Sequence, residues 1–299
     1  MKLDLGESLL DSSQVTHATD GLTEALSGTA LALGDGFKAE SFRAVEIGRT
    51  MDPLVMVDHY VMTEPTFGAH PHAGMSAVSL LFEDSEGLLH NRDSLGNDFD
   101  LRPGDLYWLS AGSGAVHDES PRAGSRTHGL QVFINVPHSE RFANPSSRLV
   151  RSEEMPIIEG IGYRVKVAMG ESGTVRGAVS PSTPMTVLDG SIEPNGQFYH
   201  RTGPDRGIWV HAIRGGLEVT VGKTTRHLSH RQAIAIDSVE SAEITISNPG
   251  NEASHFALFD GAQIDETYVQ EGPFVMTSQQ QIVDIKKAYA AGELGTLAV

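Results

Sequence analysis

Short apolar runs separated by turn residues dominate the chain from Phe37 onward, and this pattern predicts β-structure. Such runs occupy residues 44–47, 78–82, 106–109, 130–136 and 164–168, among others. Stretches rich in Gly, Pro, Ser and Asn lie between them. Many short strands at close spacing with turns of this kind are typical of a sandwich or a barrel.

The β pattern breaks once and then returns. Residues 137–156 contain three prolines together with Ser, Asn and mixed charge, and we interpret this stretch as a linker. Apolar runs follow at residues 209–213, 217–221, 233–236, 242–247 and 255–259. Two β-rich halves, each of ordinary domain size, predict an all-β fold of two tandem barrels.

The two ends of the chain differ from this pattern. Residues 23–27 predict a short helical turn that Gly28 would end. Near the C-terminus, "TSQQQ" at residues 277–281 has the composition of a capping box, with Thr277 or Ser278 as the cap. Three apolar residues then recur at helical spacing, and a glycine follows that can stop a helix: Ile282, Ile285, Tyr289 and Gly292. We expect a C-terminal helix that packs across a barrel.

These patterns give predicted boundaries: an N-terminal extension at residues 1–33, a first barrel at 34–140, a linker at 141–155, and a second barrel with the C-terminal helix at 156–299.

Charge and cysteine content exclude several classes of protein. The chain has 39 acidic and 22 basic residues without a basic cluster, so we expect no direct nucleic-acid binding. It has no cysteine, which rules out disulfides, thiolate catalysis and cysteine-held metals. No apolar run reaches about 18 residues, and the N-terminus does not resemble a secretory signal. We therefore expect a cytoplasmic protein without a membrane span.

Two closely spaced pairs of polar residues predict a metal site. His70 and His72 share one face if they lie on a strand, and so do His117 and Glu119. A lone histidine is more often solvated or hydrogen-bonded in a core than bound to metal. If the two strands are neighbours, however, three imidazoles and one carboxylate converge. Metal binding then becomes the favoured interpretation.

Five stretches, in their order and spacing, resemble the pirin family of the cupin superfamily. They are "HPHAG" (70–74), "HNRDSLGN" (90–97), "RPGDLYWLSAGSGAVHDESP" (102–121), "GLQVFINVP" (129–137) and "GPFVMTSQQQI" (272–282). The resemblance implies a bicupin, in which two β-barrels lie face to face and the N-terminal barrel holds the metal. Carried over by position, the family's ligands are His70, His72, His117 and Glu119.

The resemblance also implies a cofactor and two hypotheses for function. Pirins usually hold iron, so we expect one divalent metal, Fe(II) first, with Ni, Cu, Zn or Mn as alternatives that this ligand set also accepts. Some members cleave the flavonol quercetin with dioxygen, which predicts an iron-dependent dioxygenase of quercetin 2,3-dioxygenase type, with Glu119 as ligand or base. Other members act as co-regulators, which predicts a non-enzymatic metal-sensing or redox-sensing protein that acts through a protein partner. We expect a monomer in either case.

The chain departs from the family directly after the second histidine. Family members commonly carry a basic residue, Gly, an aromatic residue and Glu there, whereas this chain has Ala73 to Ser76. Ser76 occupies the position where many cupins place a ligand glutamate. Together with His59 and His90, it is a candidate for the pocket wall or for contact with the ligands. The histidines of the second half lack partners two residues away, so we expect no metal there.

Overall fold

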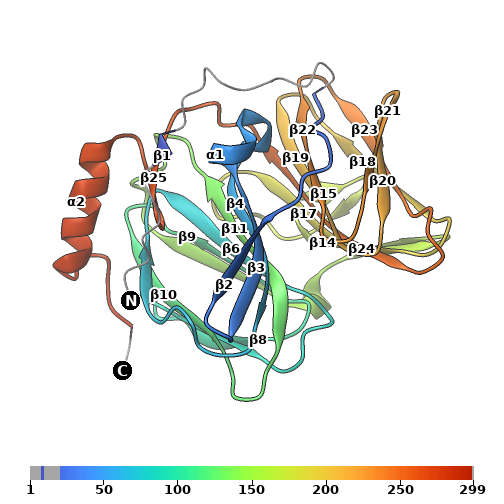
Figure 1. Ribbon diagram of the computed structural model, residues 1–299. Helices are drawn as coiled ribbons and strands as arrows, with labels where there is room; N and C mark the ends of the chain where they lie inside the picture. Colours follow the sequence, from blue (N-terminus) through green and yellow to red (C-terminus); the bar gives the residue numbers. More distant parts are fainter. Residues whose placement is uncertain (1–7, 10–20, 298–299) are drawn as a thin grey trace.

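The computed structural model describes residues 8–9 and 21–297. Residues 1–7 and 10–20 of the predicted extension therefore lie outside the described residues. Two β-barrels lie side by side, one from each half of the chain (Figure 1). The all-β, two-barrel prediction with a C-terminal helix is confirmed. Within the described part of the chain, neither α-helix has the length and apolar composition needed to cross a membrane.

The N-terminal barrel is built from two antiparallel sheets. The larger has the strand order β12-β9-β6-β11-β4-β3-β2 and the smaller has the order β5-β10-β7-β8. The strands of the larger sheet are β2 (Thr29–Leu33), β3 (Phe37–Arg43), β4 (Leu54–Met62), β6 (Met75–Leu81), β9 (Leu106–Ser110), β11 (Thr127–Asn135) and β12 (Ser146–Val150). Those of the smaller sheet are β5 (His70–His72), β7 (Leu89–Asp93), β8 (Asp98–Leu101) and β10 (Ala115–Pro121).

The C-terminal barrel repeats this plan, with sheet orders β13-β14-β17-β24-β19-β22 and β18-β23-β20-β21 and a separate β15-β16 hairpin. Its strands are β13 (Ile157–Gly160), β14 (Tyr163–Met169), β15 (Glu171–Ser172), β16 (Val175–Arg176), β17 (Met185–Ile192), β18 (Gln197–Thr202), β19 (Arg206–Arg214), β20 (Leu217–Val221), β21 (Thr224–Leu228), β22 (Ala233–Ser238), β23 (Ala242–Ser247) and β24 (Ser254–Ala262). Apolar side chains, among them Phe198, Val210 and Leu258, fill its interior.

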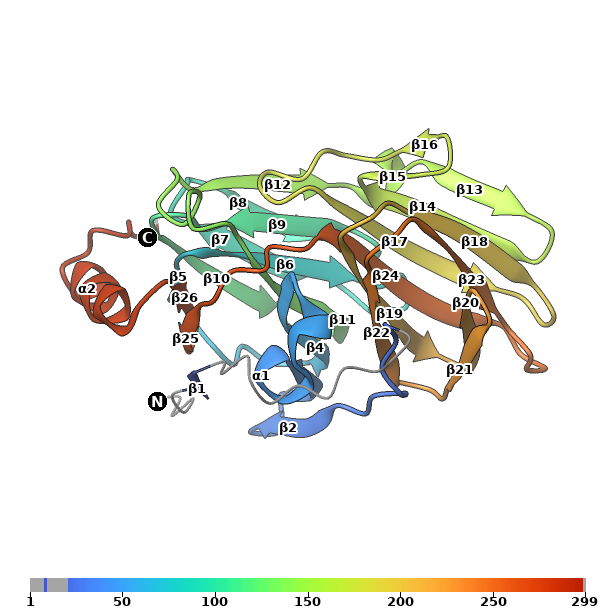
Figure 2. The same ribbon diagram turned by 90° about the horizontal axis from the view of Figure 1, so that it is seen from above.

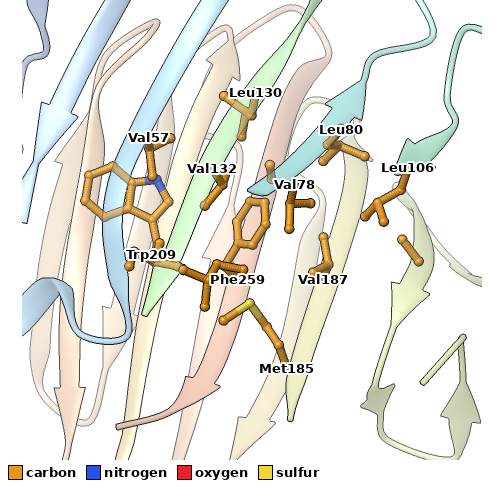
Figure 3. Close-up of a cluster of buried hydrophobic side chains, with 14 of the residues drawn as sticks. Val57, Val78, Leu80, Leu106, Leu130, Val132, Met185, Val187, Trp209 and Phe259 are labelled. Carbon is orange, nitrogen blue, oxygen red and sulfur yellow. The ribbon is translucent and has the colours of Figure 1, made fainter. Parts of the chain in front are cut away.

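A shared apolar core joins the two barrels. Trp209 and Phe259 of the C-terminal half pack among Val57, Val78 and Val132 of the N-terminal half (Figure 3). Strands of the larger sheets are consequently buried on both faces, as the uniformly buried β6 illustrates. The interface is therefore continuous core, and burial of this kind is the main stabilising contribution to a fold.

Two local predictions are wrong. Residues 44–47 were expected to be a strand, but they form the single-turn helix α1 (Ala44–Ile47), in which the Gly48 N–H donates to the Ala44 carbonyl. The 3₁₀ turn η1 (Arg49–Met51) follows, and a second one, η2 (Ser152–Glu154), lies after β12. Residues 23–27 were expected to be helical, but the backbone there is bonded to β22, with the Leu26 N–H donating to the Ala233 carbonyl at 2.8 Å. Pairing with the edge of β22 satisfies backbone N–H and C=O groups that an isolated helical turn would leave without partners.

The C-terminal segment returns to the N-terminal barrel. It contains β25 (Val269–Glu271), β26 (Phe274–Met276) and helix α2 (Gln279–Ala290), while the short β1 (Ser8–Leu9) pairs with β25. Both views place α2 on the side of the N-terminal barrel that faces away from the C-terminal barrel (Figures 1 and 2). Ile282 and Ile285 are buried there against Ala73 and Val116, which lie beside the predicted ligands.

The predicted helix cap has the expected partners. The Ser278 hydroxyl accepts from the Gln281 N–H, and the Gln281 side chain accepts from the Thr277 N–H. Tyr289 is 38% exposed, so the buried face of the helix is shorter than predicted. The domain boundaries stay a prediction. The structure adds that β12 lies inside the predicted linker and pairs with β9.

Candidate metal centre and its cavity

Three predicted ligands meet on the smaller sheet of the N-terminal barrel. His70 and His72 lie on β5, and the antiparallel register sets His117 of β10 directly opposite His70. The His117 Nε2 atom is 2.9 Å from the His72 Nε2 atom and 3.0 Å from the His70 Nε2 atom. One potential ligand atom from each histidine lies within 4.8 Å of the other two. This group could therefore hold a metal ion.

The three imidazoles are held in the neutral form that binds metals. Burial lowers the pKa of His70, and burial together with the neighbouring His70 lowers the pKa values of His72 and His117 well below the usual range. His70 Nδ1 lies 2.8 Å from the Gly68 carbonyl oxygen, which can only accept a hydrogen bond, so the proton of this ring is on Nδ1. The lone pair on His70 Nε2 is thus directed toward the other two rings.

The spacing of the nitrogen atoms fits a common metal ion. Two ligand atoms about 2.1 Å from one ion lie about 3.0 Å apart when they are at right angles, and about 3.4 Å apart in a tetrahedral arrangement. The observed 2.9 and 3.0 Å match the first arrangement. Ligands at right angles are typical of six-coordinate metals, which keep open positions when three or four protein ligands are bound.

Glu119 lies beside the three histidines but outside their group. It shares a strand face with His117, and the Ser79 hydroxyl lies 2.8 Å from each of its carboxylate oxygens. Burial raises the pKa of Glu119 to about 7, although the hydrogen bond from Ser79 opposes this shift. The structure therefore brings together three of the four predicted ligands. The fourth, Glu119, is a buried carboxyl group at the edge of the same site.

A cavity of about 180 Å³ lies over the histidines. Its wall is mainly apolar, and it includes His70, His72 and Glu119 from the predicted site. The apolar part comes from Leu31, Leu33, Phe37, Met56, Met62, Phe67, Leu89 and Phe133. Phe133 packs edge-on against His72, with ring centroids 5.1 Å apart. A mainly apolar cavity beside a few polar groups is the usual form of a small-molecule binding site.

Sequence reasoning missed a row of polar residues in the larger sheet, of which Asp58 and Gln131 line the cavity. In the larger sheet, Ser41 of β3, Asp58 of β4, Gln131 of β11 and Ser79 of β6 are cross-strand neighbours in one row. The Ser79 hydroxyl also lies 3.0 Å from Gln131 Oε1, so the row continues to Glu119. Every second residue of β4 from Met56 to Met62 faces the cavity, but β4 is buried on both faces, so its sequence did not mark this face.

The three remaining candidates do not line this cavity. His59 faces the interface between the barrels, where its Nε2 atom is 2.7 Å from the Nε2 atom of His128. Ser76 also faces that side, because its hydroxyl lies 2.8 Å from the Ser182 hydroxyl of the second half. His90 pairs with Asp98 at 2.8 Å. Strand alternation explains the first two placements, since His59 and Ser76 are each an odd number of residues from cavity-facing Asp58 and Ser79.

The C-terminal segment completes the cavity wall. Gly272 and Pro273 line the cavity, and the Val275 N–H donates to the Ala73 carbonyl at 3.0 Å. The fully buried Arg141 guanidinium donates to the carbonyl oxygens of both Gly74 and Val275, at 2.9 and 2.8 Å. The strand that carries the first two histidines is thereby fixed to a segment about 200 residues away.

Two barrels of this topology, with three converging histidines in the first, define a bicupin with a candidate metal centre. The chain matches the family model "Pirin" over residues 27–134 and the model "Pirin C-terminal cupin domain" over residues 187–295. The chain belongs to the pirin family. The first match begins at residue 27, so the last part of the predicted extension, including β2, falls within the family's own domain.

Relatives and solved structures agree with this assignment. The chain is 30% identical to pirin of Rattus norvegicus over 236 residues (78% of this chain and 79% of the relative) and 28% identical to pirin of Homo sapiens over 235 residues (78% and 80%). Its fold is similar to that of a quercetin 2,3-dioxygenase from Acinetobacter baumannii, with a TM-score of 0.80, 24% identity and coverage of 93% and 99% of the two chains. It is also similar to a bacterial pirin from Escherichia coli in complex with nickel(II), with a TM-score of 0.60, 22% identity and coverage of 80% and 97%.

Proposed function

We propose that this protein is a metal-dependent dioxygenase of quercetin 2,3-dioxygenase type. Its substrates are aromatic compounds with two adjacent oxygen donors, and flavonols are one such class. The observation that carries the proposal is the position of three neutral, converging imidazoles at the wall of a mainly apolar cavity. The similarity of the fold to a quercetin 2,3-dioxygenase supports the choice of reaction.

His70, His72 and His117 would hold the metal, with Fe(II) first and Ni, Cu, Zn or Mn as alternatives. Glu119 would be the fourth ligand or the base. A redox-active ion at this site supplies the one-electron chemistry that allows dioxygen to react with a closed-shell aromatic substrate. The apolar wall around it excludes water, which strengthens the electrostatic interactions of a bound, deprotonated substrate.

Glu119 is suited to take the proton of the substrate hydroxyl. Its carboxyl lies in the cavity, and a pKa of about 7 places it near the range in which a general base is most effective. The proton would move from the hydroxyl oxygen to a Glu119 carboxylate oxygen. The Ser79 hydroxyl, bonded to the same carboxylate, fixes its orientation.

The test is oxygen consumption by iron-loaded protein with quercetin, together with the release of carbon monoxide. We expect His117→Ala to lose its bound iron and to be at least about 100-fold less active than the wild type. His90→Ala is the matched control, because His90 lies outside the cavity, and it should keep both. Wild-type protein with a full complement of iron that consumes no oxygen would overturn the proposal.

The second candidate function is a metal-sensing or redox-sensing regulatory protein that acts through a protein partner. The observation that favours it is the bonding of the ligand strand to the C-terminal segment, through Ala73 and Val275. A change in iron charge would then reach α2 on the outer surface. Hydrogen exchange measured on the Fe(II) and Fe(III) forms tests this: sensing expects altered protection over residues 269–290, and identical protection would count against it.

We also propose that the protein is a cytoplasmic monomer and that it does not bind nucleic acid. The formal charge of −17 supports the last of these, because it opposes binding to phosphate backbones.

A further inference from the structure

We propose that Asp58 selects the substrate. It accepts a hydrogen bond from a hydroxyl group on the far side of a single aromatic ring, whose two adjacent oxygen atoms face the three histidines. The class of ligand is therefore an aromatic compound that carries hydroxyl groups on both sides of the ring next to the histidines. This inference rests on the proposed function only in taking the histidines as the metal site.

The first argument is the unsatisfied hydrogen-bonding capacity of Asp58. Its carboxylate is 7% exposed and lines the cavity. One oxygen, Oδ1, accepts from the Ser41 hydroxyl at 2.5 Å. Among the described residues no protein group donates to the second oxygen, Oδ2. Asp58 Oδ2 is not among the fully buried unpaired atoms, so it reaches the cavity, where Arg43 is the neighbouring positive charge. An acceptor at such a position gains from a hydrogen-bond donor when a ligand displaces water. A ligand hydroxyl in the cavity would supply the missing donor.

The second argument is the orientation that neighbouring residues impose on Asp58. Ser41 lies directly across from it on β3, and Gln131 lies directly across on β11. Gln131 is itself engaged, since its Oε1 is 3.0 Å from the Ser79 hydroxyl and its Nε2 donates to the Val78 carbonyl at 3.3 Å. The second N–H of Gln131 Nε2 makes no hydrogen bond to Asp58 among the described residues, and both side chains line the cavity.

The third argument is the size of the cavity. A cavity of roughly 150 Å³ lined by apolar side chains holds one benzene molecule, whereas sites for larger drug-sized ligands occupy about 300–1,000 Å³. The 180 Å³ found here corresponds to one ring with its substituents. The cavity is open on one side, so the further rings of a flavonol would extend out of it.

The fourth argument is the separation between Asp58 and the metal side of the cavity. Asp58 lies two strands from Ser79, which bonds Glu119 beside the histidines. Adjacent strands are about 4.8 Å apart, so the two positions are separated by about 10 Å along the sheet. One aromatic ring that carries oxygen atoms at both ends, together with a hydrogen bond at one end, spans such a distance.

The test is calorimetric titration of zinc-loaded protein, in which zinc supports binding but no redox turnover. The ligands are catechol, which has only the adjacent oxygen pair, and 1,2,4-benzenetriol, which adds a hydroxyl on the far side of the ring. We expect the triol to bind the wild-type protein about tenfold more tightly than catechol. Asp58→Asn should remove this advantage and leave catechol binding unchanged.

Two further variants control for effects on folding. Asp84→Asn alters a carboxylate outside this cavity, hydrogen-bonded to His128, and should keep the full advantage of the triol. Ser41→Ala keeps the Asp58 charge but removes the hydroxyl that orients it, and it should reduce the advantage in part. If Asp58→Asn does not fold, the Ser41→Ala result decides, and an unchanged advantage in that variant would overturn the proposal.

The outcomes separate this inference from the proposed function. Equal binding of the two ligands to wild type, an advantage that survives in Asp58→Asn, or no binding of either ligand overturns the role of Asp58. If the Asp58 dependence is found but iron-loaded protein consumes no oxygen, the dioxygenase proposal fails and the ligand site remains.

Discussion

His211 is a buried titratable residue at the junction of the two barrels. It is fully buried, and its ring packs edge-on against His59 and Phe42, with centroids 4.9 and 5.2 Å away. Burial, reinforced by the positive charge of Arg231, lowers its pKa from 6.5 to about 3. The folded state therefore disfavours the protonated ring, whereas the unfolded state accepts a proton near pH 6.5. Stability is complete above pH 6.5 and falls as the pH drops toward 3.

His211→Phe should reduce this loss of stability in acid. Phe keeps an aromatic ring in the site but cannot bind a proton. When the pH falls from 7 to 5, the unfolding free energy of the variant should decrease by about 2 kcal/mol less than that of the wild type. Urea denaturation at the two pH values measures this. His227→Phe, at a position where the side chain is 75% exposed, should behave like wild type. Equal pH dependence in wild type and His211→Phe would contradict the assignment.

At the residue scale, the sequence predicted the histidine cluster because its members occur in pairs two residues apart. Residues two positions apart on a strand point to the same face, and the register between β5 and β10 then brings the two pairs together. The roles of Asp58 and His59 could not be predicted in this way. β4 is buried on both faces, so its sequence lacks the apolar–polar alternation that marks the inner face of a strand. Only the fold shows that Asp58 points into the cavity and His59 away from it.

At the element scale, long strands and the C-terminal helix were predictable, and isolated turns were not. The run at residues 44–47 is largely apolar and has two β-branched residues, as in a strand, but it is too short for its period to distinguish strand from helix. Gly48 adopts a φ of 98° and ends the turn there. The helix α2, by contrast, carries a cap, a periodic apolar face and a terminal glycine, which agree with one another.

Gly74 is the element-scale position at which a small change should be most damaging. It has a φ of +70°, and a Cβ atom there would lie 2.0 Å from the Val275 carbonyl oxygen. Gly74→Ala should lower the unfolding free energy by about 4 kcal/mol, because it combines strain with a backbone clash. It should also weaken metal binding, because Gly74 lies two residues after His72.

Gly34→Ala is the matched control for this prediction. Gly34 has a similar φ of +61° and no atom within 4 Å of the added Cβ. Strain alone should cost about 1 kcal/mol there. Chemical denaturation and metal titration of both variants give the comparison. A Gly74→Ala protein no less stable than Gly34→Ala would show that β26 does not pack against this glycine in solution.

At the scale of the whole molecule, the shared core predicts that the two barrels unfold together. The chain contains two tryptophans, Trp108 in the first barrel and Trp209 in the second, and both belong to the inter-barrel core. Trp108→Phe and Trp209→Phe each leave a single fluorescent reporter in one barrel. We expect the fluorescence midpoint of each variant to coincide with its own circular dichroism midpoint. A difference of more than about 3 °C in either variant would indicate barrels that melt separately.

The tandem β halves were visible in the sequence, because turn spacing and apolar runs repeat on both sides of residues 137–156. The return of the chain end to the first barrel was not. The Ala73–Val275 bond joins residues about 200 positions apart, and nothing in the local pattern of either segment specifies the other. Contacts of this range depend on the packing of the whole molecule.

The wall formed by Gly272 and Pro273 also has a consequence for the order of events during synthesis. The three histidines are translated first, and at about 5–20 residues per second the segment that closes their cavity follows some ten to thirty seconds later. If the first barrel folds during this interval, its three candidate ligands lie in a pocket that lacks one side. Any ion captured at that stage sits in an open, exchangeable site. A metal ion bound by the three histidines would therefore exchange less readily once this segment has folded over the cavity.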